Sequence, residues 1–267
     1  MPIKRANDFA AYEDGERTGR GRGCGDRYQP WLRTSDVTHS NGSRCRMYSA
    51  KCGRVVHLLS HAEHKFFVHL DWLPEVVEIQ EQFPLDPEET QAIAKSQGVR
   101  HPGYSFGGCV MTTDFRVRWK GSRGFYWTAF QVKSSRRDVE SKRAQEKLEI
   151  EREYWKRHKV PWEVVFASDL DAVYVQNLLL LVPYRNELCT KQDLQYLLAF
   201  FNRLRNRFPD ADASQLAEAD IRLPSQRVIS AWDAVALLAG KQLIEVPVKE
   251  KDLFVCTMQD FEVKHVS

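Results

Sequence analysis

Apolar and polar positions change their spacing several times along residues 53–170, and each change marks an expected element. The first helix is predicted over 60–72, where apolar residues recur every three or four positions: Leu59, Ala62, Phe66, Leu70 and Leu73. The expected elements that follow are a strand at 76–85, a short helix at 86–98, strands at 109–119 and 125–135, a helix at 137–158 and a strand at 161–170. This order predicts a mixed α/β domain.

Beyond about Ser168 the pattern becomes mostly helical. Helices are predicted at 173–181, 191–208, 212–220 and 226–241, and residues 242–256 are expected to form a two-stranded wing. The chain is therefore divided into a catalytic α/β domain at 1–168, with a basic N-terminal arm, and a second domain at 169–267. Short helices ending in a hairpin indicate a helix-turn-helix or winged-helix module, with a plain helical docking domain as the alternative.

The strand "FYWTAFQVKSS" (125–135) carries chemistry because Gln131 and Lys133 are two positions apart and share one face. A hairpin turn at 120–124 places Asp114 opposite Gln131 and Thr112 opposite Lys133. The carboxylate, the amide and the ammonium are then expected to meet on one face of the hairpin. The alternative is a solvated face with a weak surface pair, which is less favoured where helices flank the strands.

Glu63 supplies a second acid. The stretch "SHAE" (60–63) matches a capping box, in which Glu63 returns to the N-cap amide. However, Glu63 also lies four positions from Leu59 and Phe67, at the edge of the apolar face, where an acid needs a partner or a metal. We favour the metal interpretation over the cap.

Two carboxylates and a neutral amide are hard oxygen donors, which suit Mg²⁺, or Mn²⁺ as a substitute, rather than zinc. Lys133 is placed to orient water and to offset charge on a reacting phosphate. Zinc sites are disfavoured: there is no C-x-x-C pair, Cys45 and Cys52 lack regular partners, and the histidines at 57, 61 and 64 do not form H-E-x-x-H.

Composition changes this picture little. Of 267 residues, 43% are hydrophobic and 28% charged, as expected for a soluble globular protein, and no apolar run approaches the ~20 residues of a membrane span. A cytoplasmic location without membrane contact is expected. The net charge is only +3, but residues 1–60 hold eleven Lys or Arg against six Asp or Glu. The run "RTGRGRGCGDR" (17–27) is either a flexible loop or a basic arm along phosphates.

These motifs together resemble the TnsA-like family of transposon endonucleases within the restriction-endonuclease-like nuclease superfamily. The resemblance rests on the segments "GRGCGDRYQPWL", "GRVVHLLSHAE", "EQFPL", "MTTDF", "FQVK" and "KLEIEREYW". It implies a restriction-endonuclease-like mixed sheet flanked by helices. It also implies a metal-dependent DNA endonuclease subunit of a heteromeric cut-and-paste transposase that hydrolyses the 5′ strands of transposon ends.

The resemblance assigns roles residue by residue. Glu63 and Asp114 would be side-chain metal ligands, and the Val132 carbonyl would be a backbone ligand. Gln131 stands where many relatives have Glu, and Lys133 would be the catalytic lysine. The site would hold two Mg²⁺ ions. On the next helix Glu149 would support the site, although Glu146, Glu151 and Glu153 are close neighbours. The implied partners are double-stranded transposon-end DNA, an RNase-H-like transposase subunit and an AAA+ regulator ATPase.

Two other functions stay open at this point. One is a stand-alone restriction or repair nuclease of the same fold, and the other is a non-cleaving DNA-binding module, against which the retention of Glu63, Asp114 and Lys133 argues.

The neutral amide of Gln131 leads to a first prediction. Because Gln in place of Glu removes one negative charge, we expect the free protein to bind Mg²⁺ weakly and the DNA complex to bind it more tightly. Calorimetric titration with and without DNA measures the difference. Equal affinities in the two states would contradict it.

Overall fold

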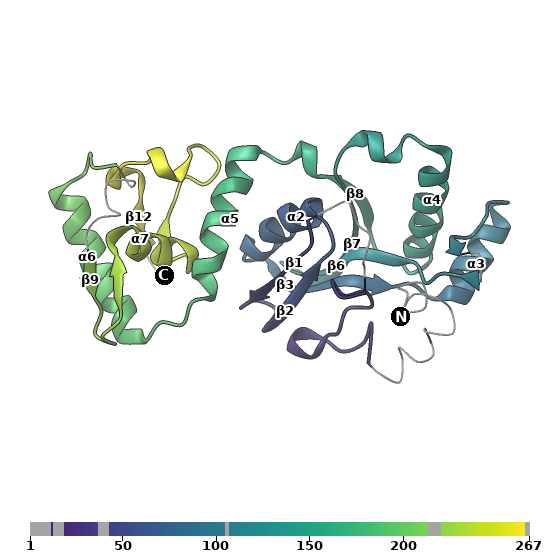
Figure 1. Ribbon diagram of the computed structural model, residues 1–267, viewed down its shortest axis with the longest axis horizontal. Helices are drawn as coiled ribbons and strands as arrows, with labels where there is room; N and C mark the ends of the chain where they lie inside the picture. Colours follow the sequence, from purple (N-terminus) through teal and green to yellow (C-terminus); the bar gives the residue numbers. More distant parts are fainter. Residues whose placement is uncertain (1–11, 13–18, 37–42, 105–106, 213–219, 265–267) are drawn as a thin grey trace. The chain divides into compact units, whose positions relative to one another are not determined.

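The computed structural model describes residues 12, 19–36, 43–104, 107–212 and 220–264. The chain divides into two compact units, Met1–Asp169 and Leu170–Ser267, which are taken separately below (Figure 1). The run at 17–27, predicted as a flexible loop or a basic arm, is described from residue 19 onward, whereas residues 1–11 and 13–18 lie outside the described part of the chain.

A four-stranded mixed sheet forms the centre of the first unit, in the order β3-β6-β7-β8. Its strands are β3 (Val76–Pro84), β6 (Thr112–Gly121), β7 (Gly124–Lys133) and β8 (Trp162–Phe166). β6 pairs antiparallel with both β3 and β7, whereas β8 joins β7 in parallel. The parallel step is possible because a helix connects β7 to β8, as parallel neighbours require.

Helices cover both faces of this sheet, as Figure 1 shows. On one face lies α2 (His61–Trp72), whose Phe66 ring is 5.9 Å from Phe115 on β6 and 5.2 Å from Phe130 on β7. On the other face α3 (Pro87–Ser96) and α4 (Lys142–Arg157) close a buried cluster: Leu85, Ile93, Ala94, Met111, Ala129, Ile150, Tyr154 and Trp155. The predicted mixed α/β class is confirmed.

Local signals set several element boundaries. The Ser60 side chain accepts from the Glu63 N–H and starts α2, and Asp86 caps α3 with Pro87 in its first turn. The single helix predicted over 137–158 is wrong: a 3₁₀ helix at Arg136–Val139 comes first, and α4 starts only after the cap at Ser141. Capping by a Ser inside the polar run divides it in two.

The described part of the Gly/Arg run packs against the sheet. The Gly21 N–H donates to the Gln29 carbonyl at 2.7 Å, and Arg20 pairs with Asp36 at 2.7 Å. Gly21 has a φ of +70°, and a Cβ there would collide with the Pro84 ring, so only glycine fits. Residues 19–27 are thus a folded segment and not a loose loop.

Two antiparallel pairs lie outside the four-stranded sheet of this unit. β1 (Cys45–Ser49) and β2 (Arg54–Leu58) form a hairpin. The short strands β4 (Gly103–Tyr104) and β5 (Gly107–Gly108) pair with each other.

The second unit is built on three helices, α5 (Ala172–Asn186), α6 (Lys191–Arg207) and α7 (Ala231–Gly240). Most of the helix predicted at 212–220 lies outside the described residues. Two short antiparallel pairs accompany the helices: β9 (Asp220–Arg222) with β10 (Val228–Ser230), and β11 (Ile244–Glu245) with β12 (Glu262–Val263). The helix predicted at 226–241 therefore starts later, where Ser230 and Asp233 form a capping box.

The two-stranded wing predicted within 242–256 is wrong. Its strand β11 pairs with β12, beyond that segment, while residues Leu253–Val255 form a 3₁₀ helix. Pro247 begins a turn here, with the Glu250 N–H bonded to its carbonyl, and the Asp252 side chain caps the 3₁₀ helix through the Phe254 N–H. Both features stop an extended strand.

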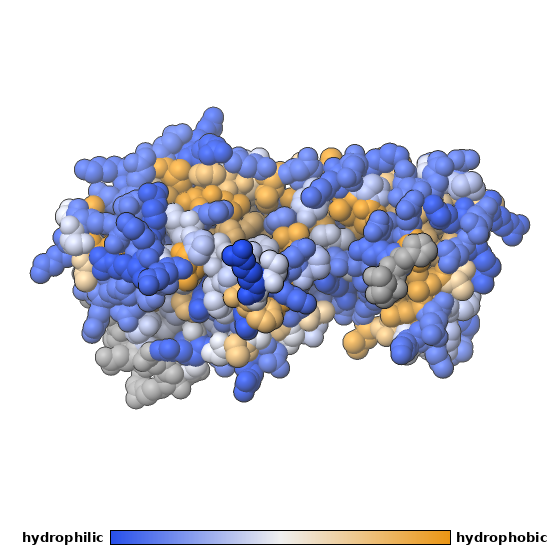
Figure 2. All heavy atoms as spheres, turned by 180° about the vertical axis from the view of Figure 1, so that it is seen from behind, coloured by the Kyte–Doolittle hydropathy of each residue, from blue (hydrophilic) through white to orange (hydrophobic). Residues whose placement is uncertain are grey.

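Hydrophilic side chains predominate on the face seen in Figure 2, with apolar residues surfacing in scattered groups. None of the helices in the described residues is both long and apolar enough to cross a membrane.

Candidate active site

Glu63 lies in the first turn of α2 with its carboxylate turned toward the sheet. Its Oε2 accepts from the Leu59 N–H at 2.9 Å, and its Oε1 accepts from the Ser60 hydroxyl at 2.8 Å. The side chain is 6% exposed. Glu63 thus holds the start of the helix through the Leu59 N–H and the Ser60 hydroxyl, and not through the N-cap amide of the predicted capping box, while the metal interpretation stays a prediction.

Asp114 lies on β6, close to the point where β6 and β7 separate. The predicted hairpin register is correct, with Gly121 opposite Gly124 and Phe115 opposite Phe130. The ladder ends at that last pair, and the Asp114 Oδ2 instead accepts from the Val132 N–H at 2.8 Å. The separation of the strands therefore directs the Val132 N–H at the acid, which fixes the carboxylate.

Gln82 on β3 joins the two acids, and no sequence pattern pointed to it. Its Nε2 donates to Glu63 Oε2 at 3.3 Å and to Asp114 Oδ1 at 3.2 Å. Its Oε1 accepts from the Thr112 hydroxyl at 3.0 Å. Three elements, α2, β3 and β6, thus converge on one buried amide.

Gln131 and Lys133 both line a pocket of about 490 Å³ on the α4 side, together with Glu151, Arg143 and Lys147. The ammonium of Lys133 acts electrostatically on both Asp114 and Glu151, lowering the pKa of each against the effect of burial. The structure therefore gathers Asp114, Gln131 and Lys133 around the end of β7, as the sequence predicted. Asp114, however, reaches Val132 and Gln82 and does not line this pocket.

Of the two acids, Glu151 lines the pocket of Gln131 and Lys133, and Glu149 does not. The Glu149 side chain is 48% exposed and pairs with Arg152 at 2.9 Å. Glu151 is buried, and its Oε1 accepts from the Thr113 hydroxyl at 2.6 Å and from Trp162 Nε1 at 2.9 Å. Burial raises the pKa of Glu151 to about 7, and the charge of Asp114 adds to the rise.

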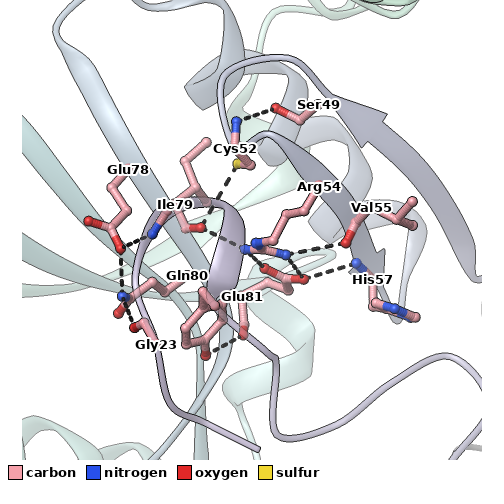
Figure 3. Close-up of polar contacts among 12 residues, drawn as sticks. Gly23, Ser49, Cys52, Arg54, Val55, His57, Glu78, Ile79, Gln80 and Glu81 are labelled. Atoms are coloured by element: carbon pink, nitrogen blue, oxygen red, sulfur yellow. Dashed lines mark hydrogen bonds and ion pairs between the residues drawn. The ribbon is translucent and has the colours of Figure 1, made fainter. Parts of the chain in front are cut away.

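A buried polar network lies beside the site and anchors the strand that carries Gln82 (Figure 3). Arg54 on β2 makes a bidentate ion pair with Glu81, with Nη1–Oε1 at 2.7 Å and Nη2–Oε2 at 2.6 Å. Its Nη2 also donates to the Ile79 carbonyl at 2.9 Å. The Tyr28 hydroxyl donates to the Glu81 carbonyl at 2.9 Å. Glu81 and the strand beside Gln82 are therefore held from two directions.

The electrostatics of the two acids reflect their closeness. Burial raises the pKa of Glu63 to about 8, with the negative charge of Asp114 as the second cause. Burial also raises the pKa of Asp114, opposed by Lys133 and by the bonds from the Val132 N–H and Gln82. Two desolvated carboxylates, with the charge of Asp114 raising the pKa of Glu63, are a pair that a bound cation would stabilise.

These shifts predict a loss of metal-free stability with rising pH. Because the folded chain holds the Glu63 proton up to about pH 8 and the unfolded chain only to about 4.5, this stabilisation is complete below 4.5 and is lost through pH 8. From pH 6.5 to 8.5 we expect the free energy of unfolding to fall by on the order of 1–2 kcal/mol more in the wild type than in Glu63→Gln.

Urea unfolding in chelator measures this difference. The comparison with Glu63→Gln cancels the contributions of the half-buried histidines, His57, His64 and His101, whose lowered pKa values act in the opposite sense. Identical pH profiles in the two proteins would contradict the shift.

The donor set fits a hard divalent cation. Gln131 Oε1 is buried and has no hydrogen-bond partner among the described residues, so a polar atom at the end of β7 has no protein partner to satisfy it. Together with the carboxylates of Glu63 and Asp114 and the Val132 carbonyl, it offers the oxygens that Mg²⁺ and Mn²⁺ prefer. Within the described residues, no group of three or more His, Cys, Asp or Glu is arranged to hold a metal.

Comparison with known proteins gives two matches. Residues 73–166 match the family described as TnsA-like endonuclease N terminal. The transposon Tn7 transposition protein TnsA of Escherichia coli is 40% identical over 171 residues, which cover 64% of this chain and 62% of that protein. The family match contains Asp114, Gln131, Lys133 and Glu151, and Glu63 precedes it.

Proposed function

We propose, from the match of residues 73–166 to the TnsA-like endonuclease family, that the chain is the metal-dependent endonuclease subunit of a heteromeric cut-and-paste transposase. Its substrate is the DNA of the transposon ends, where it hydrolyses phosphodiesters of the 5′ strands. The observation that carries the proposal is the pair of buried acids, Glu63 and Asp114, which share the Gln82 amide, with the charge of Lys133 acting on Asp114.

The residues divide into ligands and a charged partner. Glu63, Asp114, Gln131 and the Val132 carbonyl would hold Mg²⁺, or Mn²⁺ in its place, and the bound cation supplies a Lewis acid for the scissile phosphate. Lys133 orients the attacking water and offsets negative charge as it grows on the phosphate oxygens. Glu151 keeps Lys133 in place through its charge, and its bonds to Thr113 and Trp162 keep Glu151 itself fixed.

The finer class of each unit follows from the same premise. We assign the first unit to the restriction-endonuclease-like fold, supported by the order β3-β6-β7-β8 and by helices on both faces of the sheet. The helical unit from Leu170 onward serves to dock other transposition proteins: an RNase-H-like subunit that cuts and joins the 3′ ends, and an AAA+ regulator ATPase. This assignment rests on the family alone.

A cleavage assay tests the proposal. Labelled transposon-end DNA is incubated with Mg²⁺ and the protein, alone and with its partner transposase, beside random-sequence DNA of equal length. We expect 5′-strand cuts at the ends that depend on Mg²⁺ and on the partner. Vigorous cutting of random DNA by the protein alone would favour a stand-alone nuclease, and no cutting under any condition would refute the catalytic assignment.

A further inference from the structure

Gln82 adopts a backbone conformation that is rare for a residue with a side chain. Its φ is +48°, in the left-handed region, although it lies inside β3 between two regular pairs, Glu81 with Phe115 and Phe83 with Thr113. Such a conformation costs about 1–3 kcal/mol for a residue other than glycine and persists only where the surroundings hold it. The Trp31 N–H does so, since it donates to the Gln82 carbonyl at 3.2 Å.

With this backbone conformation, the Gln82 side chain lies between Glu63 and Asp114. The Nε2 of Gln82 lies 3.3 Å from Glu63 Oε2 and 3.2 Å from Asp114 Oδ1, and the residue is 3% exposed. An amide nitrogen carries two N–H donors, and here each acid takes one. The partial positive charge of the NH₂ group therefore occupies the space where a bridging cation would have to lie.

We propose that Gln82 is a placeholder for the catalytic cation: its NH₂ group holds Glu63 and Asp114 together in the metal-free protein and must leave that space when metal binds. The inference rests on the proposed function, since the cation is that of the nuclease. Every cation that enters replaces two hydrogen bonds to carboxylates, so Gln82 weakens metal binding to the free protein. The amide then has Thr112 as its remaining partner, whose hydroxyl can either donate or accept.

A competing role and a purely structural role of Gln82 predict opposite changes in metal affinity when its side chain is removed. If Gln82 only kept the acids in position, its removal would loosen the site and weaken metal binding. If it competes with the cation, its removal strengthens binding. Glycine is the suitable replacement, because it accepts the left-handed conformation without strain and lacks the amide.

The experiment is a calorimetric titration of Mn²⁺ into the full chain without DNA, for the wild type, Gln82→Gly and Gln80→Ala. Gln80 is the matched control: it lies on the same strand, is equally buried at 3%, and donates its amide to Glu78 at 2.8 Å. We expect Gln82→Gly to bind Mn²⁺ about 3- to 10-fold more tightly than the wild type and Gln80→Ala to bind as the wild type does. Thermal melts establish that each variant is folded.

A second readout follows the amide itself. The side-chain NH₂ signals of Gln82 in a ¹⁵N spectrum are assigned by their loss in Gln82→Gly, and we expect Mg²⁺ to shift them while those of Gln80 stay in place. Unchanged or weaker Mn²⁺ binding by Gln82→Gly, or unmoved Gln82 signals at Mg²⁺ saturation, would overturn the placeholder role alone. Failure of the wild type to bind Mn²⁺ with or without DNA would overturn the metal site, and the placeholder with it.

Discussion

Asp114→Asn is expected to lower the rate of strand cleavage by about 10³-fold or more while leaving the protein folded. The carboxylate is buried and fixed by the Val132 N–H, and it offers the oxygens for a cation beside Lys133. Asn keeps the volume and one carbonyl oxygen but removes the negative charge that, in the proposed mechanism, would bind the metal. A loss of this size corresponds to about 4 kcal/mol of transition-state stabilisation, a reasonable share for a metal-assisted hydrolysis.

Stability and activity are expected to separate in this variant. Asn removes the buried negative charge of Asp114, whose desolvation opposes folding, so the melting temperature in chelator should not fall substantially. Single-turnover cleavage of transposon-end DNA with the partner transposase measures the rate. Glu163→Gln, which changes an exposed carboxylate on β8, is the control and should cleave normally. Cleavage by Asp114→Asn at the wild-type rate would contradict the assignment of Asp114 to the active site.

Much of the site was predictable because short-range rules determine it. A hairpin with a known turn has its register fixed, and alternation then decides which residues share a face. This reasoning gave the pairing of β6 with β7 correctly and brought Gln131 and Lys133 to one pocket. The start of α2 after Ser60 was equally predictable, since an N-cap serine is a local signal.

The same local rules could not predict where the Gln82 side chain lies. Alternation along β3 assumes extended backbone, and a left-handed residue inside the strand redirects its side chain. What holds that conformation is the Trp31 N–H, 51 positions earlier in the chain. Residues that depend on such distant partners carry no local pattern, although Gln82 lies within the "EQFPL" motif on which the family resemblance partly rests.

The sequence could not tell which of Glu149 and Glu151 is buried, for a related reason. Both acids belong to a highly charged helix, and residues two positions apart on a helix point in different directions. The acid that is buried is the one that finds donors, and these are Thr113 on β6 and Trp162 on β8. Tertiary hydrogen bonds therefore decide which glutamate serves the site, and helical periodicity does not.

The largest expected effect on stability comes from the Arg54–Glu81 pair of Figure 3. The side chains are 8% and 0% exposed, and the two N···O distances are 2.7 Å and 2.6 Å. Replacing Arg54 alone leaves the Glu81 carboxylate buried, with the His57 N–H, at 3.1 Å, as the hydrogen-bond donor that remains within the network of Figure 3. Removing one member of a buried pair costs more than the pair contributes, because the other charge stays desolvated.

We therefore expect Arg54→Met to lower the free energy of unfolding by about 3–5 kcal/mol, measured by urea unfolding at pH 7. The double variant Arg54→Met/Glu81→Leu should recover much of this loss, because no unpaired charge is then buried. The surface pair Arg136–Asp169 is the control: its side chains are 71% and 49% exposed, so Asp169→Ala should cost less than about 1 kcal/mol. A loss below 1 kcal/mol in Arg54→Met would mean that water reaches Glu81 when Arg54 is absent.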